Sequence, residues 1–253
     1  MYSFKGINSA LVGMSKELLE NGKWRETRGF KCLELPHPII IKIDNPSARH
    51  ILIKERKWNW FLPYAESLWM ALGWSNLDDL PGHYVKNLYN FSDDNETWRG
   101  SYGPRMRYYS PSKTQYNIGK HNDNIELEHT DQFRYIVEAF KRDENTRQAI
   151  ITIADPNKDS FDKSGNILPS KDYPCTRELH FMKNTEGKLD LIVKMRSNDI
   201  LWGFSAVNVF NFTFMLEYFS YVLNIPMGNY YHVVDNFHVY QNFVERIEEF
   251  AFV

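Results

Sequence analysis

The most apolar stretch of the sequence, Phe210 to Ile225, constrains the fold more than any other segment. It is interrupted by Glu217 and several polar residues and falls short of a membrane span, which favours a buried helix. The predicted helix, from Val207 to about Val222, is apolar almost all round, as expected of a helix inside a core. At 253 residues, of which 43% are hydrophobic, the chain can bury one large core. We therefore expect residues 1–253 to form a single domain.

The charge balance argues against a nucleic-acid partner. The formal net charge is −2 and the pI is about 6.5, so no overall basic field would hold a polynucleotide backbone. The two cysteines, Cys32 and Cys175, are too few for a disulfide scaffold, and the first residues contain no apolar signal-peptide core. The sequence therefore predicts a cytoplasmic protein (host cytoplasm if it is viral) with free thiols and no membrane association.

Local patterns predict helices and strands in mixed order along the first third of the chain. They indicate a helix at 7–20, strands at 30–35 and 38–43, and a helix at 64–73. Asn45 and Pro46 look like an N-cap followed by proline at the first helical position. That pattern predicts a further helix, which would run towards Trp60 before Pro63 breaks it.

The rest of the chain is expected to be richer in strands. Residues 75–124 are polar and aromatic, with the Gly, Pro, Asn and Asp content of a long irregular segment. After it we expect a helix capped by Thr130-Asp131, a strand at 149–154, a polar loop at 155–171, two strands at 176–182 and 188–196 joined by a hairpin turn at 184–187, a strand-like run at 230–240 and a short final helix. Arg196 should emerge at a strand end, where ligand-binding side chains often lie.

Cys175 is the first candidate for chemistry. It follows Pro174 and precedes a predicted strand, so its backbone would be held while its thiol could face a cleft. Free cysteines are often buried and inert, which is the commoner case without further context. A nearby arginine such as Arg196 would favour the thiolate and with it a nucleophilic role.

Other polar residues have both a structural and a functional interpretation. Glu66 lies on an otherwise apolar helix, either as a helix-start carboxylate or as a catalytic group. Asn208 and Asn211 lie three residues apart in the buried helix, where their amides either stitch the core or contact a ligand. His238 and Tyr240 share one strand face and could donate hydrogen bonds to a sugar hydroxyl. The sequence has no phosphate-binding glycine loop, serine elbow or metal-spaced cluster, so no metal is predicted.

Together these residues resemble the thymidylate synthase family, which includes phage deoxypyrimidine nucleotide hydroxymethylases. Pro174-Cys175 is similar to the family's nucleophile motif, Arg196-Ser197-Asn198-Asp199 with Gly203 to its phosphate and base segment, and His238-x-Tyr240 to its sugar-binding pair. Weaker similarities are found at Glu66-Ser67-Leu68-Trp69, Tyr102-Gly103, Thr146-Arg147 and Arg28-Gly29. The likeness runs from about Arg28 to Tyr240, which is most of the chain.

The resemblance implies an α+β sandwich, with helices on one face of a mixed β-sheet and a homodimer that packs sheet against sheet. It implies that the Cys175 thiolate adds to C6 of a pyrimidine nucleoside monophosphate, and that C5 then attacks a one-carbon unit from 5,10-methylenetetrahydrofolate. The implied roles are catalysis for Glu66 and Asp199, phosphate binding for Arg196, Ser197, Arg28 and an Arg147 that reaches the partner's site, base binding for Asn208 or Asn211, sugar binding for His238 and Tyr240, and folate binding for Trp69, Tyr89, Asp199 and Gly203.

Departures from the synthase pattern favour a hydroxymethylase, in which water captures the methylene group. Thr176 stands where synthases usually carry histidine, Gln148 replaces a second arginine, Tyr89 stands in place of a tryptophan, and the sequence stops soon after Tyr240. We therefore expect hydroxymethylation of dUMP, since the amide of Asn208 suits uracil. The alternatives are a thymidylate synthase, a dCMP or CMP hydroxymethylase and a non-catalytic nucleotide-binding homologue.

Overall fold

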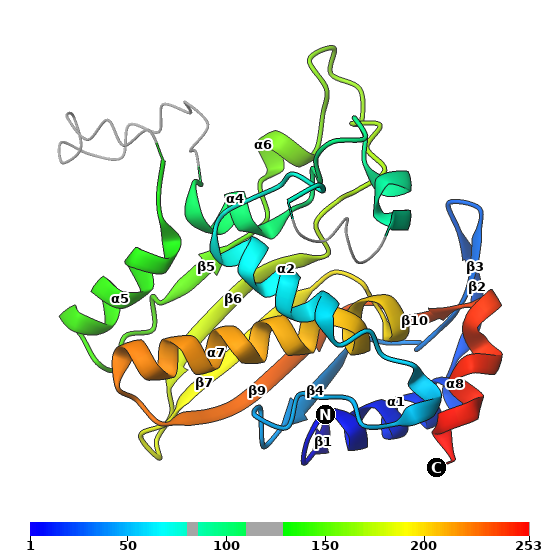
Figure 1. Cartoon of the computed structure of the whole chain (residues 1–253), viewed down its shortest axis with the longest axis horizontal. Helices are drawn as coiled ribbons and strands as arrows, with labels where there is room; N and C mark the ends of the chain where they lie inside the picture. The colour runs from blue at the N-terminus through cyan, green and yellow to red at the C-terminus, as the bar shows by residue number, and fades with distance from the viewer. Residues whose placement is uncertain (80–85, 110–128, 253) are drawn as a thin grey trace.

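Two β-sheets and the helices packed on them make up the structure (Figure 1). The computed structural model describes residues 1–79, 86–109 and 129–252. The larger sheet has six strands in the order β1-β4-β9-β7-β6-β5, and the smaller has four in the order β2-β3-β10-β8. Each sheet combines parallel and antiparallel pairs. The fold class is therefore α+β, as predicted.

The elements follow one another in mixed order. The strands are β1 Tyr2–Phe4, β2 Lys23–Thr27, β3 Phe30–Glu34, β4 Ile39–Ile43, β5 Ile150–Thr152, β6 Thr176–Lys183, β7 Leu189–Met195, β8 Asn198–Asp199, β9 Met227–Val234 and β10 Phe237–Tyr240. The α-helices are α1 Ile7–Asn21, α2 Phe61–Ala71, α4 Tyr102–Arg107, α5 Gln132–Arg142, α6 Pro156–Asp159, α7 Val209–Leu223 and α8 Val244–Ala251. Short 3₁₀ segments are η1 Lys54–Arg56, η2 Lys86–Phe91 and η5 Gln241–Phe243, and η4 Ile200–Asn208 is a π-helix.

The β6–β7 hairpin forms as the sequence predicts. Its strands pair antiparallel from Lys183 and Leu189 at the turn to Thr176 and Met195 at the open end. In the turn the Asn184 N–H donates to the Lys188 carbonyl at 2.8 Å, and Gly187 takes a positive φ of 78° that suits glycine. The open end of this hairpin brings the residue before β6 next to the residue after β7.

The chain passes from the larger sheet to the smaller one at two neighbouring places. β7 belongs to the larger sheet and β8 to the smaller, and the parallel strand β9 is likewise followed by β10. Backbone hydrogen bonds join the two crossings, from Asp235 N–H to the Met195 carbonyl at 3.0 Å and from Asn198 N–H to the Asn236 carbonyl at 2.9 Å. The strand predicted at 230–240 is thus wrong as one element, because the chain changes sheets in its middle.

Helix α7 lies across the larger sheet and packs against β7 and β9 (Figure 1). The π-helix η4 runs directly into it, so the helical segment Ile200–Leu223 is 24 residues long. By length and composition this segment could cross a membrane, whereas the apolar run from Phe210 to Ile225 alone is too short to do so. Its most apolar window is 67% buried against the rest of the protein, as predicted for a core helix. The main hydrophobic core cluster contains residues from both ends of the chain, from Ile7 to Phe250.

The helix predicted from Asn45 towards Trp60 is wrong. The structure has only the 3₁₀ turn η1 in this region. The backbone of residues 45–48 pairs instead with the start of the chain. The Asn45 N–H donates to the Lys5 carbonyl at 3.0 Å, and the Ala48 carbonyl accepts from the Ile7 N–H at 3.1 Å. Pro63 does not break a helix either, since it lies in the first turn of α2, where a missing N–H costs little.

Of two further local features, one is predicted from the sequence and the other is not. Asp131 caps α5 as predicted, since its carboxylate accepts from the Phe133 N–H at 3.0 Å. Strand β2 is missed by the sequence patterns, although it pairs with β3 over its whole length. Arg28 and Gly29 form the two-residue turn between them, both with positive φ. Within the irregular segment expected at 75–124, residues 80–85 and 110–124 lie outside the described residues.

The aromatic contact between α7 and the larger sheet provides a test of the core. Phe219 is fully buried, and its ring centroid lies 4.7 Å from that of Phe181 and 5.2 Å from that of Phe133. We expect Phe219→Ala to lower the free energy of unfolding by about 3–5 kcal/mol, measured by urea denaturation, because it leaves a cavity. Tyr221→Ala, at a residue that is 87% exposed on the same helix, should change it by less than about 0.5 kcal/mol. Equal losses in the two variants would contradict this packing.

Candidate active site

The open end of the β6–β7 hairpin brings Cys175 and Arg196 together. The Arg196 N–H donates to the Cys175 carbonyl at 2.9 Å, so the two backbones are directly joined. The Arg196 guanidinium folds back over the same loop, where Nε donates to the Pro174 carbonyl at 3.1 Å and Nη2 to the Tyr173 carbonyl at 3.0 Å. Nη1 makes no hydrogen bond within the described residues and is available to an anion.

The thiol of Cys175 is not activated in the way that the sequence predicts. Burial raises its pKa above the ordinary value, and the positive charge of Arg196 opposes this effect without reversing it. The carboxylate of Asp172 raises the pKa further, whereas Arg28 and Arg177 lower it. The protonated thiol is therefore the resting form. Arg177, on β6, is a nearby cation that the sequence motifs do not single out.

The other predicted phosphate ligands lie at different distances from this centre. Arg28, at the exposed tip of the β2–β3 hairpin, is close enough to influence the pKa of Cys175. Ser197 follows Arg196 at the crossing, and its hydroxyl donates to Asn236 Oδ1 at 3.4 Å. Arg147 is exposed just before the edge strand β5 and takes no part in the described hydrogen bonds around Cys175. The structure thus brings Arg196, Ser197 and Arg28 to one region, but not Arg147.

Asp199 and His238 face each other across the β8–β10 pair, directly beyond the crossing. One oxygen of Asp199, Oδ1, accepts from the backbone N–H groups of Leu201 and Trp202 at 2.8 and 2.5 Å. Its other oxygen, Oδ2, and His238 Nδ1 are buried and have no hydrogen bond of ordinary geometry among the described residues, although the Tyr240 backbone N–H lies near enough to lower the pKa of Asp199. Burial raises the pKa of Asp199, and His238 is the leading opposing influence. Unpaired buried polar atoms of this kind suit a site that receives a polar ligand.

Tyr240 completes this group on the same strand. Its ring packs edge-on against that of His238, with 5.2 Å between the ring centroids. Burial raises the pKa of the Tyr240 hydroxyl, and Asp199 raises it further. The predicted pair of His238 and Tyr240 therefore lies beside Asp199.

The two asparagines of the buried helical segment have different surroundings. Both polar atoms of the Asn211 amide have partners within the protein, because Nδ2 donates to Glu66 Oε1 at 2.9 Å and Oδ1 accepts from the Ser67 hydroxyl at 2.8 Å. Asn208 accepts from Asn198 Nδ2 at 2.8 Å, and its own Nδ2 donates no hydrogen bond within the described residues. Of the two, Asn208 is therefore the one that can donate to a ligand.

Glu66 is buried on α2, with 8% of its surface exposed. Burial raises the pKa of its carboxyl from 4.5 to about 7, and the hydrogen bond from Asn211 only partly opposes the shift. A carboxyl group with this pKa can exchange a proton near neutral pH. The sequence could identify the acid on its apolar helix, but not the Asn211 and Ser67 contacts that hold it.

Gly203 lies directly against the Asn198–Asn208 hydrogen bond. A Cβ atom at this residue would come within 2.2 Å of Asn198 Nδ2 and 2.8 Å of Asn208 Oδ1. Glycine is thus required here by space rather than by backbone conformation.

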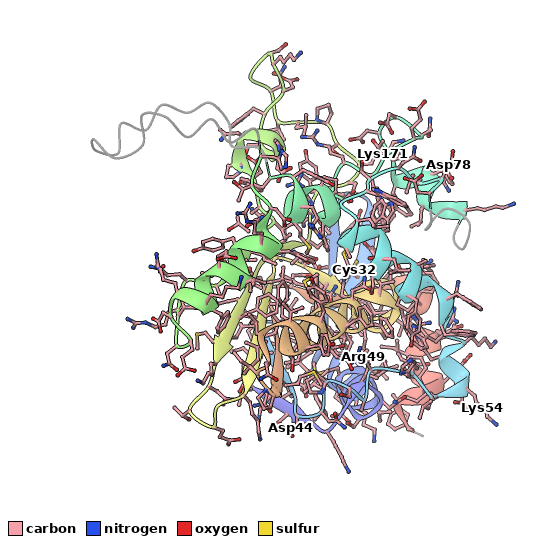
Figure 2. All side chains as sticks on the ribbon, turned by 60° about the vertical axis from the view of Figure 1, so that its left-hand side comes forward. Cys32, Asp44, Arg49, Lys54, Asp78 and Lys171 are labelled. Carbon is pink, nitrogen blue, oxygen red and sulfur yellow. The ribbon has the colours of Figure 1, made fainter. Side chains whose placement is uncertain are left out.

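The predicted folate residues Trp69 and Tyr89 have partners inside the protein. Trp69 is only 1% exposed, and its Nε1–H donates to the Asn76 carbonyl at 2.8 Å. Tyr89 is half-buried and donates to Asp78, which lies at the upper right of Figure 2. Direct contact of either ring with folate stays a prediction.

Cys32 is the second thiol, and it lies in the interior of the molecule with only 2% of its surface exposed (Figure 2). Burial raises its pKa to about 11, and Glu34 is the next cause. A cysteine in this state is a poor nucleophile near neutral pH.

Two surface hollows lie elsewhere. One, of about 660 Å³, is lined by residues between His50 and Trp60, and the other, of about 490 Å³, by residues that include Asp93, Arg105 and Lys158. Neither hollow is lined by Cys175 or Arg196.

The fold and this site define a class of protein: an α+β domain with a cysteine held against an arginine beside buried, unpaired polar atoms. Comparison with known families gives the same class. The thymidylate synthase family model matches residues 10–251, nearly the whole chain. The chain belongs to the thymidylate synthase family.

Individual relatives are phage and bacterial proteins. The chain is 35% identical over 242 residues to a deoxyuridylate hydroxymethyltransferase of Bacillus phage SP01, covering 95% of this chain and 59% of the relative. It is 29% identical over 248 residues to a protein of the same name from Delftia phage PhiW-14, covering 96% and 63%. A thymidylate synthase of Bacillus licheniformis is 27% identical over 132 residues, covering 52% and 44%. The chain thus spans about six-tenths of the length of the phage relatives.

The raised pKa of Glu66 has a measurable effect on stability. Between pH 4.5 and about 7 the folded protein holds a proton that the unfolded chain has released, so stability falls as the pH rises through this window. We expect Glu66→Gln to lack this loss. Between pH 5 and 8 the free energy of unfolding of the wild type should therefore fall by up to about 3 kcal/mol relative to that of Glu66→Gln. Urea denaturation at both pH values measures the difference.

The matched control is Glu20→Gln, at an exposed glutamate of α1, which should keep the pH dependence of the wild type. Parallel stability curves for wild type and Glu66→Gln would show that Glu66 titrates normally.

Proposed function

We propose that this protein transfers a one-carbon unit from 5,10-methylenetetrahydrofolate to C5 of dUMP and that water captures the resulting methylene, which gives 5-hydroxymethyl-dUMP. The observation that carries the proposal is the joining of Cys175 and Arg196 at the open end of the β6–β7 hairpin. The 35% identity to a phage deoxyuridylate hydroxymethyltransferase supports the reaction type.

In the proposed mechanism the Cys175 thiol gives up its proton to water, Sγ forms a bond to C6 of uracil, and the electrons of the C5–C6 double bond move towards O4. Asn208 Nδ2 donates to O4 and stabilises the developing charge. The folate, when bound, supplies the one-carbon unit that C5 attacks. Glu66 moves protons near the base, for which its pKa of about 7 is suited. The C5 proton then leaves, and tetrahydrofolate would depart from the transferred carbon as the leaving group. Water adds to the resulting exocyclic methylene, and the bond from Cys175 to C6 breaks.

The remaining residues would bind the two substrates. Arg196 Nη1, Ser197 and Arg28 would hold the 5′-phosphate, and His238 and Tyr240 the sugar. The unpaired Asp199 Oδ2 is a buried acceptor that fits an N–H group of the base or of the folate ring. Gly203 would contribute to the folate site by keeping the neighbouring amides in place, with Trp69 and Tyr89 as further contacts.

We also propose that residues 1–253 act as a single cytoplasmic domain that forms a homodimer, with no nucleic-acid or membrane partner. The outward face of β9 supports the dimer, because its alternate residues are half-exposed: Met227, Asn229, Tyr231 and Val233. Arg147 lies exposed beside the edge strand of the same sheet, from which it would reach the phosphate site of the partner subunit.

A thymidylate synthase activity is the second candidate, since the chain is also similar to bacterial thymidylate synthases. Two signals separate the reactions. We expect dUMP labelled with tritium at C5 to release its label in the presence of methylenetetrahydrofolate without a rise in absorbance near 340 nm, since only reductive methylation produces dihydrofolate. A rise matched by thymidylate formation would overturn hydroxymethylation, and turnover of dCMP alone would identify a cytosine enzyme.

Replacing the nucleophile tests catalysis itself. Cys175→Ser should reduce tritium release by at least about 10³-fold, because a serine hydroxyl is far less acidic and less nucleophilic than a thiol. Cys32→Ala is the matched control, as it removes the other thiol, and it should retain turnover. A Cys175→Ser protein as active as the wild type, or a wild type that binds dUMP without releasing tritium, would point to the non-catalytic homologue.

A further inference from the structure

A buried row of side chains leads to Asn208 from the larger sheet. The Tyr230 hydroxyl lies 2.7 Å from His232 Nδ1, and His232 Nε2 lies 2.9 Å from Asn198 Oδ1. Asn198 Nδ2 then donates to Asn208 Oδ1 at 2.8 Å. Tyr230 and His232 are fully buried on β9, and the two asparagines are 3% and 6% exposed. We refer to Tyr230, His232 and Asn198 as the amide relay.

The relay runs in one direction because of the hydroxyl at its start. The hydrogen of the buried Tyr230 hydroxyl has His232 Nδ1 as its partner, which makes Nδ1 the acceptor. Neutral imidazole carries its proton on one nitrogen, so Nε2 is the donor to Asn198 Oδ1. Asn198 Nδ2 then donates to Asn208, which must accept through its Oδ1. The orientation of the Asn208 amide is thereby fixed from 22 residues away in sequence, at Tyr230.

The opposite orientation of the Asn208 amide would require every hydrogen bond of the amide relay to reverse its direction. Asn198 would turn its oxygen to Asn208 and its nitrogen to His232, which would then need its proton on Nδ1. The Tyr230 hydroxyl would accept that proton, and its own hydrogen would be left buried without an acceptor. A buried donor in this state is costly, so the reversed row is disfavoured.

The surroundings keep the relay buried, neutral and in place. Burial lowers the pKa of His232 to about 3, so the imidazole stays neutral at ordinary pH. Its ring packs edge-on against Phe204, with 5.2 Å between the centroids. Gly203 leaves room for the two asparagine amides to meet, where any Cβ would collide with both. Such a site supports one arrangement of hydrogen bonds.

We propose that the amide relay makes this protein selective for uracil by fixing Asn208 with its Nδ2 donor towards the base. This inference rests on the proposed function, in which Asn208 contacts the pyrimidine. Uracil offers O4 as an acceptor to that donor, and the second lone pair of Asn208 Oδ1 can accept from N3–H. Cytosine presents an amino group in place of O4, and two donors would face each other. Tyr230, His232 and Asn198 are positioning residues that act through Asn208.

The test is the ratio of kcat/KM for dUMP to that for dCMP, measured by tritium release from C5 of each nucleotide. Tyr230→Phe removes the hydroxyl that sets the direction, because either direction then leaves His232 Nδ1 without a partner, as an acceptor in the present row and as a donor in the reversed row. We expect the ratio to fall roughly tenfold or more in this variant. A loss that is equal for both nucleotides would mark Tyr230 as merely structural and would overturn the proposal.

A second variant and a control guard against misfolding. Asn198→Ala removes the amide that holds Asn208, and it should lower the same ratio at least as far, even if Tyr230→Phe does not fold. Thr213→Val is the matched control because it removes another buried hydroxyl, which bonds only to the Val209 and Phe210 carbonyls of its own helix. It should leave the ratio unchanged.

A spectroscopic measurement tests the relay without relying on turnover. Long-range ¹H–¹⁵N correlation of the unmodified protein should show the His232 proton on Nε2, and a proton on Nδ1 would overturn the proposed direction. If the unmodified protein turns over dUMP but the ratio is the same in all variants, the selectivity inference fails while the proposed function stands. If it releases tritium from neither nucleotide although the Nε2 proton is found, the proposed function is what fails, and selectivity falls with it.

Discussion

The parallel crossing from the larger sheet to the smaller one is the constraint on which the site depends. Backbone hydrogen bonds from Asp235 to Met195 and from Asn198 to Asn236 hold the two strand connections side by side. Arg196 lies at the bend itself, and the residues just beyond it enter the smaller sheet. Because the β6–β7 hairpin ends at the same place, Cys175 is brought there from earlier in the chain. A shift in strand register would separate these groups.

Burial gives the polar groups around this crossing their properties. A low-dielectric environment disfavours charge, so the pKa of Glu66 rises to about 7 and those of Cys175 and Asp199 also rise. The same environment makes unpaired polar atoms costly, and amide hydrogen bonds such as that from Asn211 to Glu66 reduce this cost. Where atoms stay unpaired, as at Asp199 Oδ2, a ligand is the natural partner. Stability and chemistry are thus set by one physical effect.

Sequence patterns succeed where local physics dominates and fail where distant partners decide. The hairpin turn at Gly187 and the cap at Asp131 depend on neighbouring residues, and both are predicted correctly. The Asn45-Pro46 signal fails because the Asn45 N–H and the Ala48 carbonyl pair with the chain start, which no local window contains. Strand β2 is missed because its five residues are all exposed, so no apolar alternation marks it. The run at 230–240 is strand-like throughout, and only the second sheet divides it.

The sequence by itself determined the family and the α+β class and identified the candidate site residues, because residue types and their spacing carry that information. Only the tertiary structure decided how those residues behave. Arg196 is near Cys175, as the motifs suggest, yet burial outweighs its charge and the thiol is the resting form. The sequence favours Asn208 as the base contact and leaves Asn211 as the alternative, and the structure separates them because Glu66 and Ser67 bind the Asn211 amide while Asn208 Nδ2 has no such partner. Burial and partnership are properties of contacts between distant segments, so no single stretch of sequence contains them.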